Sequence, residues 1–159
     1  MQLFNTTIYE NISYGIAGKT KEEVYEAARA AKCHEFIEGF PDKYETTVGQ
    51  NGVQLSGGQK QRVSIARALI KNPKILLLDD CLSAVDTETE EAILNELKEN
   101  NKDTSTIIVC HRVASAKNAA YILILKDGAI VQYGTHKHLA SKAGDWDELN
   151  AKQHTQDEH

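Results

Sequence analysis

Residues 55–82 join a glycine-rich helix start to an apolar strand that ends in two carboxylates, and this order of elements constrains the fold most. The run Leu55-Ser56-Gly57-Gly58-Gln59 precedes a segment whose apolar residues keep the register of a helix. The strand follows at Ile75–Leu78, and Asp79 and Asp80 come directly after it. A wholly apolar run of this length is typical of a strand buried on both faces, as in a parallel sheet covered by helices.

The glycine-rich start can receive phosphate oxygens. Gly57 and Gly58 let the backbone approach a ligand closely, and a helix that begins beside them presents free N–H groups and the positive end of its dipole. Lys60 and Arg62 add positive charge nearby. For Ser-Gly-Gly-Gln alone, a glycine-rich cap with a solvated basic turn is an equal alternative. The strand that follows makes the phosphate interpretation the better one.

The two carboxylates stand where an open α/β sheet places its ligands, beyond the carboxyl end of a strand. One of them, Asp79 or Asp80, can hold Mg²⁺ directly or through water, and the other can orient or deprotonate an attacking water. The alternative is an acidic loop that only follows a core strand. It is common for one aspartate and poor for this arrangement.

With these elements identified, the chain resembles the nucleotide-binding domain of an ABC transporter, most closely the exporters whose membrane and ATPase domains are fused. The motifs stand in the family's order: the signature motif at Leu55–Gln59, the Walker B strand at Ile75–Asp79, the D-loop at Ser83–Asp86, and the switch histidine at His111. Residues 4–12 resemble the stretch after the Q-loop. Residues 47–52 resemble the segment that meets the coupling helices of the membrane domains. The resemblance runs from Phe4 to about Leu149.

The resemblance implies an α/β fold: a partial P-loop NTPase (RecA-like) parallel sheet with flanking helices, plus an α-helical ABC signature subdomain. We place the helical subdomain at residues 1–72 and the carboxy-terminal half of the RecA-like core at residues 73–159. Capping boxes predict helix starts at Thr20-x-x-Glu23 and Thr87-x-x-Glu90. Beyond them we expect a strand at 105–110, a hairpin around Asp127-Gly128 and closing helices near the carboxyl end.

In this family each ATP lies between the Walker loops of one domain and the signature of its partner. The resemblance therefore implies that Leu55, Ser56, Gly57, Gly58 and Gln59 contact the partner's nucleotide, with Asp86 at the dimer interface. It also implies Asp79 for Mg²⁺, Asp80 for the attacking water and His111 for the γ-phosphate. ATP and Mg²⁺ are the expected cofactors.

Each lone residue has a structural alternative. His111 can be a capped surface histidine, and Asp86 can be a turn residue ahead of the Thr87 cap. Arg67 favours a structural role, in which it ties the signature helix to neighbouring carboxylates.

The sequence departs from the family pattern in two ways that bear on activity. It contains no G-x-x-x-x-G-K-[ST] phosphate loop, so we expect a fragment that lacks Walker A and is inactive alone. Asp80 stands where the family's hydrolytic site has glutamate. The side chain is one methylene shorter, which retracts the carboxylate by about 1.5 Å, and misplacement of that size costs on the order of 100-fold in rate.

The expected partners are a second ABC ATPase domain and the transmembrane domains of a transporter. An intact signature beside a weakened Asp80 favours one half of a heterodimeric exporter over a homodimer. The chain has no apolar run long enough to span a bilayer. The resemblance implies a cytosolic domain at the cytoplasmic face of the membrane. A net charge of −5 gives no sign of a nucleic-acid surface.

Two other functions are to be weighed. The chain can be a non-catalytic module that completes a dimer by presenting its signature to a partner ATPase domain. It can also belong with the DNA-repair and chromosome ATPases, which share signature and Walker B, although no sustained heptads are present. In either case a sheet without its phosphate-loop strand exposes apolar surface, which predicts self-association.

Overall fold

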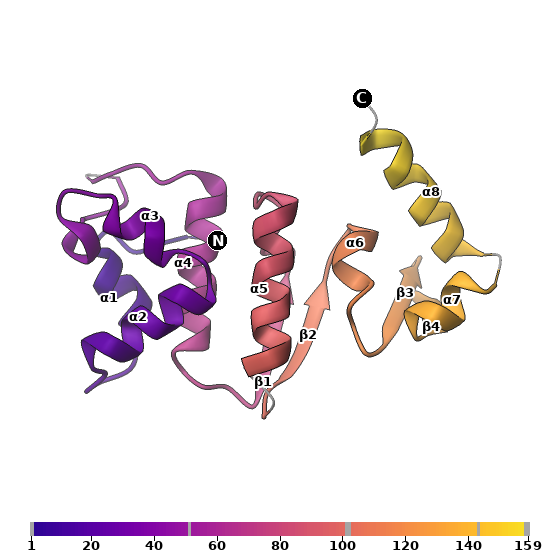
Figure 1. The fold of residues 1–159 in the computed structure, drawn as a ribbon, viewed down its shortest axis with the longest axis horizontal. Helices are drawn as coiled ribbons and strands as arrows, with labels where there is room; N and C mark the ends of the chain where they lie inside the picture. Colours follow the sequence, from indigo (N-terminus) through magenta and orange to yellow (C-terminus); the bar gives the residue numbers. More distant parts are fainter. Residues whose placement is uncertain (1, 51, 101–102, 143, 158–159) are drawn as a thin grey trace. The chain divides into compact units, whose positions relative to one another are not determined.

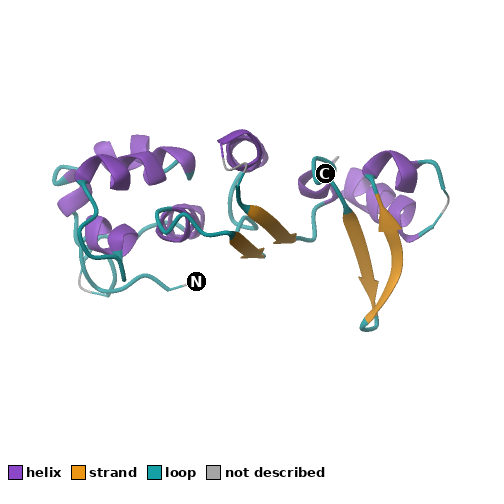
Figure 2. Cartoon of the chain, turned by 90° about the horizontal axis from the view of Figure 1, so that it is seen from below, coloured by secondary structure: helices purple, strands orange, loops and turns teal. Residues whose placement is uncertain are grey.

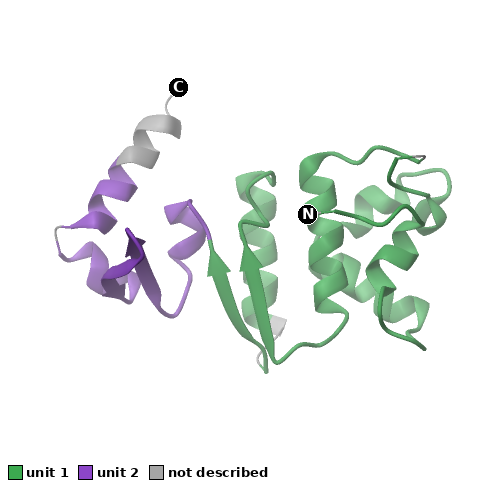
Figure 3. Ribbon diagram, turned by 180° about the vertical axis from the view of Figure 1, so that it is seen from behind, with its two compact units in different colours: residues 1–109 green, residues 110–159 purple. Residues whose placement is uncertain are grey.

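The chain forms two units, each with an apolar core of its own, and the boundary falls at the end of a strand. The computed structural model describes residues 2–50, 52–100, 103–142 and 144–157. The first unit is Met1–Val109 and the second is Cys110–His159 (Figure 3). The predicted division at residue 72 separates a helical subdomain from an ATPase core, which is a functional division and stays a prediction.

Local capping chemistry sets the helix starts of the first unit. Its first helices are α1 (Ile8–Ser13), α2 (Lys21–Ala30), α3 (His34–Glu38) and α4 (Gly57–Leu69), with a 3₁₀ turn at Lys43–Glu45 (Figure 1). Helices α1, α2 and α4 each begin with a capping box, whose cap residues are Thr7, Thr20 and Ser56. In each box the cap hydroxyl accepts the N–H of the third helical residue, whose side chain accepts the cap's own N–H. The predicted box at Thr20-x-x-Glu23 is confirmed.

The core of the first unit runs from these helices to the strands that follow. Helix α4 contributes buried residues from more than one of its faces to this core, among them Val63, Ile65 and Ala66. The same cluster contains apolar residues of α1 and α2, of strand β1 (Ile75–Asp79) and of helix α5 (Thr87–Asn100): Ile8, Ile12, Val24, Ala28, Leu76, Leu78, Ile93 and Leu97. One continuous core therefore supports both the helical elements and the strand that carries Asp79.

Asn11 is a fully buried polar residue that ties the start of the chain to α1. The Phe4 N–H donates to Asn11 Oδ1 at 2.8 Å, and Asn11 Nδ2 donates to the carbonyls of Phe4 and Thr7, each at 3.0 Å. The backbone of residues 6–8 is also bonded to residues 46–48: the Val48 N–H donates to Thr6 O at 2.9 Å, and the Ile8 N–H donates to Thr46 O at 3.0 Å. Residues 46–48 thus lie beside residues 6–8.

Two parallel strands follow the helices. Strands β1 (Ile75–Asp79) and β2 (Ser105–Val109) pair in the register Ile75↔Ser105 to Asp79↔Val109, and α5 (Thr87–Asn100) connects them (Figure 2). This parallel pair with its crossover helix is the α/β arrangement that the alternation of apolar segments predicts.

The two faces of β1 differ in burial. Leu76 and Leu78 belong to the core that α5 shares, and each is 3% exposed. On the other face Ile75 is 68% and Leu77 is 63% exposed, and Ile107 of β2 is exposed as well. The expectation of a strand buried on both faces is therefore wrong for the described residues of this unit, because α5 covers one face and no described element covers the other.

The N-cap of helix α5 lies one residue before the predicted one. Asp86, and not Thr87, is the cap: its Oδ1 accepts the Thr89 N–H at 2.9 Å and its carbonyl accepts the Glu90 N–H at 2.9 Å. Aspartate is among the strongest N-cap residues, and its charge also favours the positive end of the helix dipole.

The second unit is a hairpin with short helices. It contains α6 (Val113–Ala116), β3 (Ile122–Lys126), β4 (Ala129–Gly134), α7 (His136–Ala140) and α8 (Asp145–Asp157). The predicted turn at Asp127-Gly128 is confirmed, with φ values of 51° and 78°, the combination that a two-residue hairpin turn requires. Its core consists of Val113, Ile122, Ile124, Leu139 and Trp146. Within the part of the chain that the structure describes, no helix is both long and apolar enough to cross a bilayer.

The uncovered face of β1 makes a prediction about association. Replacing Leu77 by Lys puts charge on the exposed face, so we expect self-association of the chain to fall while its helix content stays unchanged. The neighbouring change Leu76→Lys is the matched control, because it buries an ammonium group and should unfold the unit. Sedimentation velocity and circular dichroism measure the two effects. Equal association of the wild-type and Leu77→Lys chains would contradict this prediction.

Candidate functional site

The signature residues form a capped and solvent-facing helix start. Ser56 Oγ accepts the Gln59 N–H at 3.2 Å, and Gln59 Oε1 accepts the Ser56 N–H at 2.9 Å. Leu55 is buried and anchors the turn, whereas Ser56 and Gly57 are exposed. The N–H groups of Gly57 and Gly58 have no acceptor within the helix, so this first turn can bind an anion where the dipole favours one.

The D-loop segment, residues 83–86, lies against this first turn. A Cβ atom added at Gly58 would meet the Ala84 carbonyl oxygen at 2.6 Å, and one added at Gly57 would meet Ala84 Cβ at 3.3 Å. Glycine at position 58 is therefore required by a close backbone approach as well as by any ligand. The structure thus brings two of the predicted motifs, the signature and the D-loop, into direct contact within the first unit.

The two carboxylates stand at the carboxyl end of β1. Asp79 and Asp80 are both exposed, and neither takes part in an ion pair among the described residues. The Asp80 N–H donates to Val109 O at 3.0 Å, which extends the ladder of β1 and β2 by one bond. Asp80 has a φ of 47°, a left-handed conformation that aspartate adopts more readily than most residues.

His111 and Asp86 take the following positions. His111 is exposed and belongs to the second unit, two residues after the end of β2. Asp86 belongs to the first unit, where the Thr89 N–H that it accepts lowers the pKa of its carboxyl group. Asp86 thus has a capping role in this chain, whether or not it also meets a partner.

Arg67 does not pair with carboxylates as predicted. Its Nη2 donates to Gln2 O at 3.2 Å and to Ser64 Oγ at 3.4 Å, and its guanidinium lies 5.3 Å from the centre of the Phe4 ring. None of the described ion pairs includes Arg67, and burial lowers its pKa. Sequence spacing placed Arg67 on α4 but carried no information about which segment would cover it.

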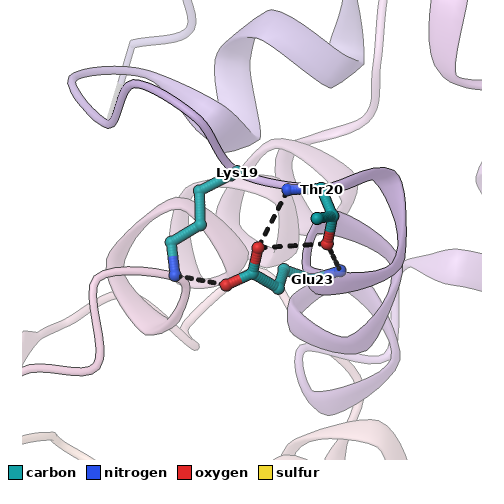
Figure 4. Close-up of polar contacts among 3 residues, drawn as sticks. All are labelled: Lys19, Thr20 and Glu23. Carbon is teal, nitrogen blue, oxygen red and sulfur yellow. Dashed lines mark hydrogen bonds and ion pairs between the residues drawn. The ribbon is translucent and has the colours of Figure 1, made fainter.

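The sequence approaches a phosphate loop once, at residues 13–20, and the structure gives this stretch another role. It ends in Gly18-Lys19-Thr20 but begins with Ser13 where the pattern needs glycine. It connects α1 to α2, whereas a phosphate loop connects a strand to a helix. Lys19 Nζ donates to Glu23 Oε1 at 2.7 Å, and Thr20 and Glu23 form the capping box of α2 (Figure 4). Lys19 is therefore engaged by a carboxylate and not presented to a phosphate.

A glycine-rich helix start, exposed carboxylates at the end of a parallel strand and a D-loop between them are typical of an ATP-hydrolysing α/β domain. The pattern of the family described as ABC transporter matches residues 1–83 of the chain. This chain belongs to the ABC transporter family.

Relatives of known name agree with this assignment. The chain is 48% identical to ATP-binding cassette sub-family B member 5 of Mus musculus over 142 residues, which are 89% of the chain and 11% of that protein. It is 43% identical to the ATP-dependent lipid A-core flippase of Chromobacterium violaceum, over 96% of the chain and 26% of that protein. The chain thus spans between about a tenth and a quarter of the length of these relatives.

A solved structure has the same fold. The structure of a bacterial Atm1-family ABC exporter with ATP bound superposes with a TM-score of 0.90 at 43% identity, covering 95% of this chain and 27% of that one. The α/β fold class and the recognition of an exporter-type nucleotide-binding domain are confirmed.

The contacts of Glu23 predict a pH dependence of stability. Hydrogen bonds from Lys19, first, and then from Thr20 lower the pKa of Glu23 from 4.5 to about 2. Because the folded-state pKa is depressed, this contribution to stability is complete above about pH 4.5 and is lost as pH falls toward 2. Replacing Glu23 by Gln should therefore lower the thermal midpoint at pH 7 and should lower it less at pH 3.

The matched control for this measurement is Glu26→Gln on the same helix, since Glu26 takes part in none of the described ion pairs. Thermal melts of the three chains at both pH values are compared. A Glu23→Gln deficit of the same size at pH 3 and pH 7 would show that the charge of Glu23 does not supply this stability.

Proposed function

We propose that this chain is part of the ATPase domain of an ABC exporter, where MgATP binding joins two such domains and hydrolysis separates them, moving the membrane domains. The observation that carries the proposal is the capped, exposed first turn of α4 in contact with the segment that follows Asp79 and Asp80. A phosphate bound at that turn would lie beside the D-loop, which follows Asp79 and Asp80 in the sequence.

The residues have distinct roles in this proposal. Leu55 holds the turn in the core. Gly57 and Gly58 present their N–H groups to the γ-phosphate of the partner's nucleotide. Ser56 and Gln59, whose N–H groups the capping box uses, offer their side-chain O–H and NH₂ groups to the same nucleotide.

The chain's own nucleotide is served by other residues. Asp80 orients and deprotonates the attacking water, and His111 contacts the γ-phosphate and holds that water in position. Asp86 meets the partner domain in addition to capping α5.

The cofactors are ATP and Mg²⁺. Asp79 fits Mg²⁺ because it offers hard oxygen donors at the exposed end of β1 and takes part in no described ion pair. Mg²⁺ in such sites is held by one or two carboxylates together with phosphate and water. When bound, the ion neutralises charge that develops on the phosphates; the chain's part is to fix the position of the Asp79 carboxylate through the pairing of β1 with β2.

The partners are a second ABC ATPase domain and the transmembrane domains. Residues 47–52 would meet the coupling helices. The backbone bonds of residues 46 and 48 to Ile8 and Thr6 hold the start of this segment in place. We favour a heterodimer, because this chain combines an intact signature with the shorter carboxylate of Asp80. The domain would lie at the cytoplasmic face of the membrane that holds the transmembrane domains.

A second candidate is a non-catalytic module that completes the active site of a partner. The observation that favours it is the engagement of Lys19 by Glu23 in the stretch that most resembles a phosphate loop. A chain without a phosphate loop would supply its signature in trans and hydrolyse nothing itself.

Mixing the chain with a complete ABC ATPase domain tests the proposal. Alone, the chain should show no MgATP turnover; together with the complete domain it should raise turnover about 100-fold, the usual contribution of such preorganised donors. Gly57→Leu should abolish that stimulation, because a Cβ atom there already lies 3.3 Å from Ala84 Cβ, so a leucine side chain would push the first turn and the D-loop apart. Lys71→Leu, which adds the same apolar group just beyond the other end of α4, is the control. Stimulation that survives Gly57→Leu would refute the role of the signature.

The kcat of the assembled transporter with Asp80→Glu tests whether the carboxylate at position 80 acts on the attacking water. Restoring the missing methylene should gain about 100-fold. The left-handed backbone of Asp80 costs glutamate roughly 1 to 2 kcal/mol, which offsets part of that gain. We therefore expect kcat to rise about 10-fold, and Asp80→Asn to remove turnover at this site. If glutamate and asparagine gave the same kcat as aspartate, position 80 would not act on the water.

A further inference from the structure

Gln61, on the second turn of α4, links the signature helix to the D-loop by its side-chain amide. The Ala84 N–H donates to Gln61 Oε1 at 3.0 Å, and Gln61 Nε2 donates to Ser83 Oγ at 3.2 Å. These residues are far apart in the sequence, and the amide satisfies one backbone and one side-chain group of the D-loop together.

The link continues to Asp80. Ser83 Oγ donates to the Asp80 carbonyl oxygen at 3.1 Å, and the Asp80 N–H donates to Val109 O at 3.0 Å. Both backbone polar groups of Asp80 are therefore held, one by β2 and the other, through Ser83, by α4. These two bonds fix the backbone from which the Asp80 carboxylate projects, so a rotation of that backbone would redirect the carboxylate.

Close packing makes this connection stiff. A side chain at Gly58 would overlap the Ala84 carbonyl, because its Cβ would lie only 2.6 Å from that oxygen. The first turn of α4 therefore has no room to shift toward the D-loop without displacing Ala84. Displacement of Ala84 in turn acts on Gln61, whose amide bonds to Ala84 and to its neighbour Ser83.

We propose that Gln61 is a positioning residue that transmits the state of the signature turn to the Asp80 backbone. The inference rests on the proposed function, in which the signature contacts the partner's nucleotide and Asp80 serves the chain's own. A nucleotide bound by the signature moves or stiffens α4, and Gln61 passes this through Ser83 to the aspartate that orients water. Gln61 thus couples the two nucleotide sites of the dimer.

Substitutions at Gln61 separate the two links of this connection. Gln61→Met has similar length and forms neither hydrogen bond. Gln61→Glu keeps an acceptor for the Ala84 N–H but takes the Ser83 hydroxyl proton for itself, so Ser83 no longer donates to Asp80. Gln132→Met is the matched control, because it also removes an amide-to-backbone bond, that of Gln132 Oε1 with the Trp146 N–H at 2.9 Å.

In the assembled transporter we expect Gln61→Met and Gln61→Glu to lower kcat about 10-fold, with the KM for ATP changed less than about twofold, as loss of one to two hydrogen bonds predicts. The Hill coefficient for ATP should fall toward one. Gln61→Met with Ser83→Ala should lower kcat no further than Ser83→Ala alone, because Gln61 acts on Asp80 through Ser83. Gln132→Met should leave kcat and the Hill coefficient unchanged.

A second measurement uses the chain alone and needs no activity. Amide NMR shifts of Asp80 and Ala84 should move in Gln61→Met, whereas in Gln61→Glu the Asp80 shift should move more than that of Ala84. Wild-type kcat and Hill coefficient in Gln61→Met, with an unmoved Asp80 amide, would overturn the inference and leave the proposed function standing. A wild-type assembly without nucleotide-dependent pairing or turnover would instead overturn the proposed function itself.

Discussion

The first turn of α4 and the D-loop segment 83–86 lie so close together that no side chain fits between Gly58 and the Ala84 carbonyl. Much of the first unit depends on this contact, because α4 joins the helices to the strands. Toward the helices, α4 packs in the same core as α1 and α2, and Arg62 Nη1 donates to Lys32 O at 2.7 Å. Toward the strands, its first turn meets the loop that leaves β1. The glycine that we propose for phosphate binding is thus also required by the fold.

The helix starts, the strand and the turn that were predicted correctly depend on interactions between residues close together in the sequence. The cap at Thr20 and the helix start at Ser56 depend on residues three positions apart, so their hydrogen bonds could be foreseen. The strand at Ile75 and the turn at Asp127-Gly128 likewise follow from local composition. The cap of α5 was misplaced by one residue because Asp86 and Thr87 are both good cap residues and only the path of the D-loop decides between them.

Contacts between distant residues explain what the sequence did not predict. The alternating burial of β1 depends on which faces the helices cover, and an apolar run does not say that Leu77 stays exposed. Arg67 has backbone carbonyl, hydroxyl and aromatic partners instead of carboxylates; it lines a cavity of about 490 Å³ with Tyr14, Lys71 and Leu77. The bonds of Gln61 to residues 83 and 84 have no local signal at all. Gly18, Lys19 and Thr20 resemble the end of a phosphate loop, but they follow a helix and not the strand that such a loop requires.

The parallel pairing of β1 with β2 has a consequence for how the chain folds. Residues that pair, such as Ile75 and Ser105, are separated by the whole of α5 and its flanking loops. Closing so long a connection costs entropy before any ladder bond is gained, and such non-local pairings form slowly. The capped helices, whose contacts are local, should therefore appear earlier in folding than the strand that carries Asp79. The carboxylates would then reach their final place only after α5 has docked, which makes the strand pair the slow step in assembling this end of the site.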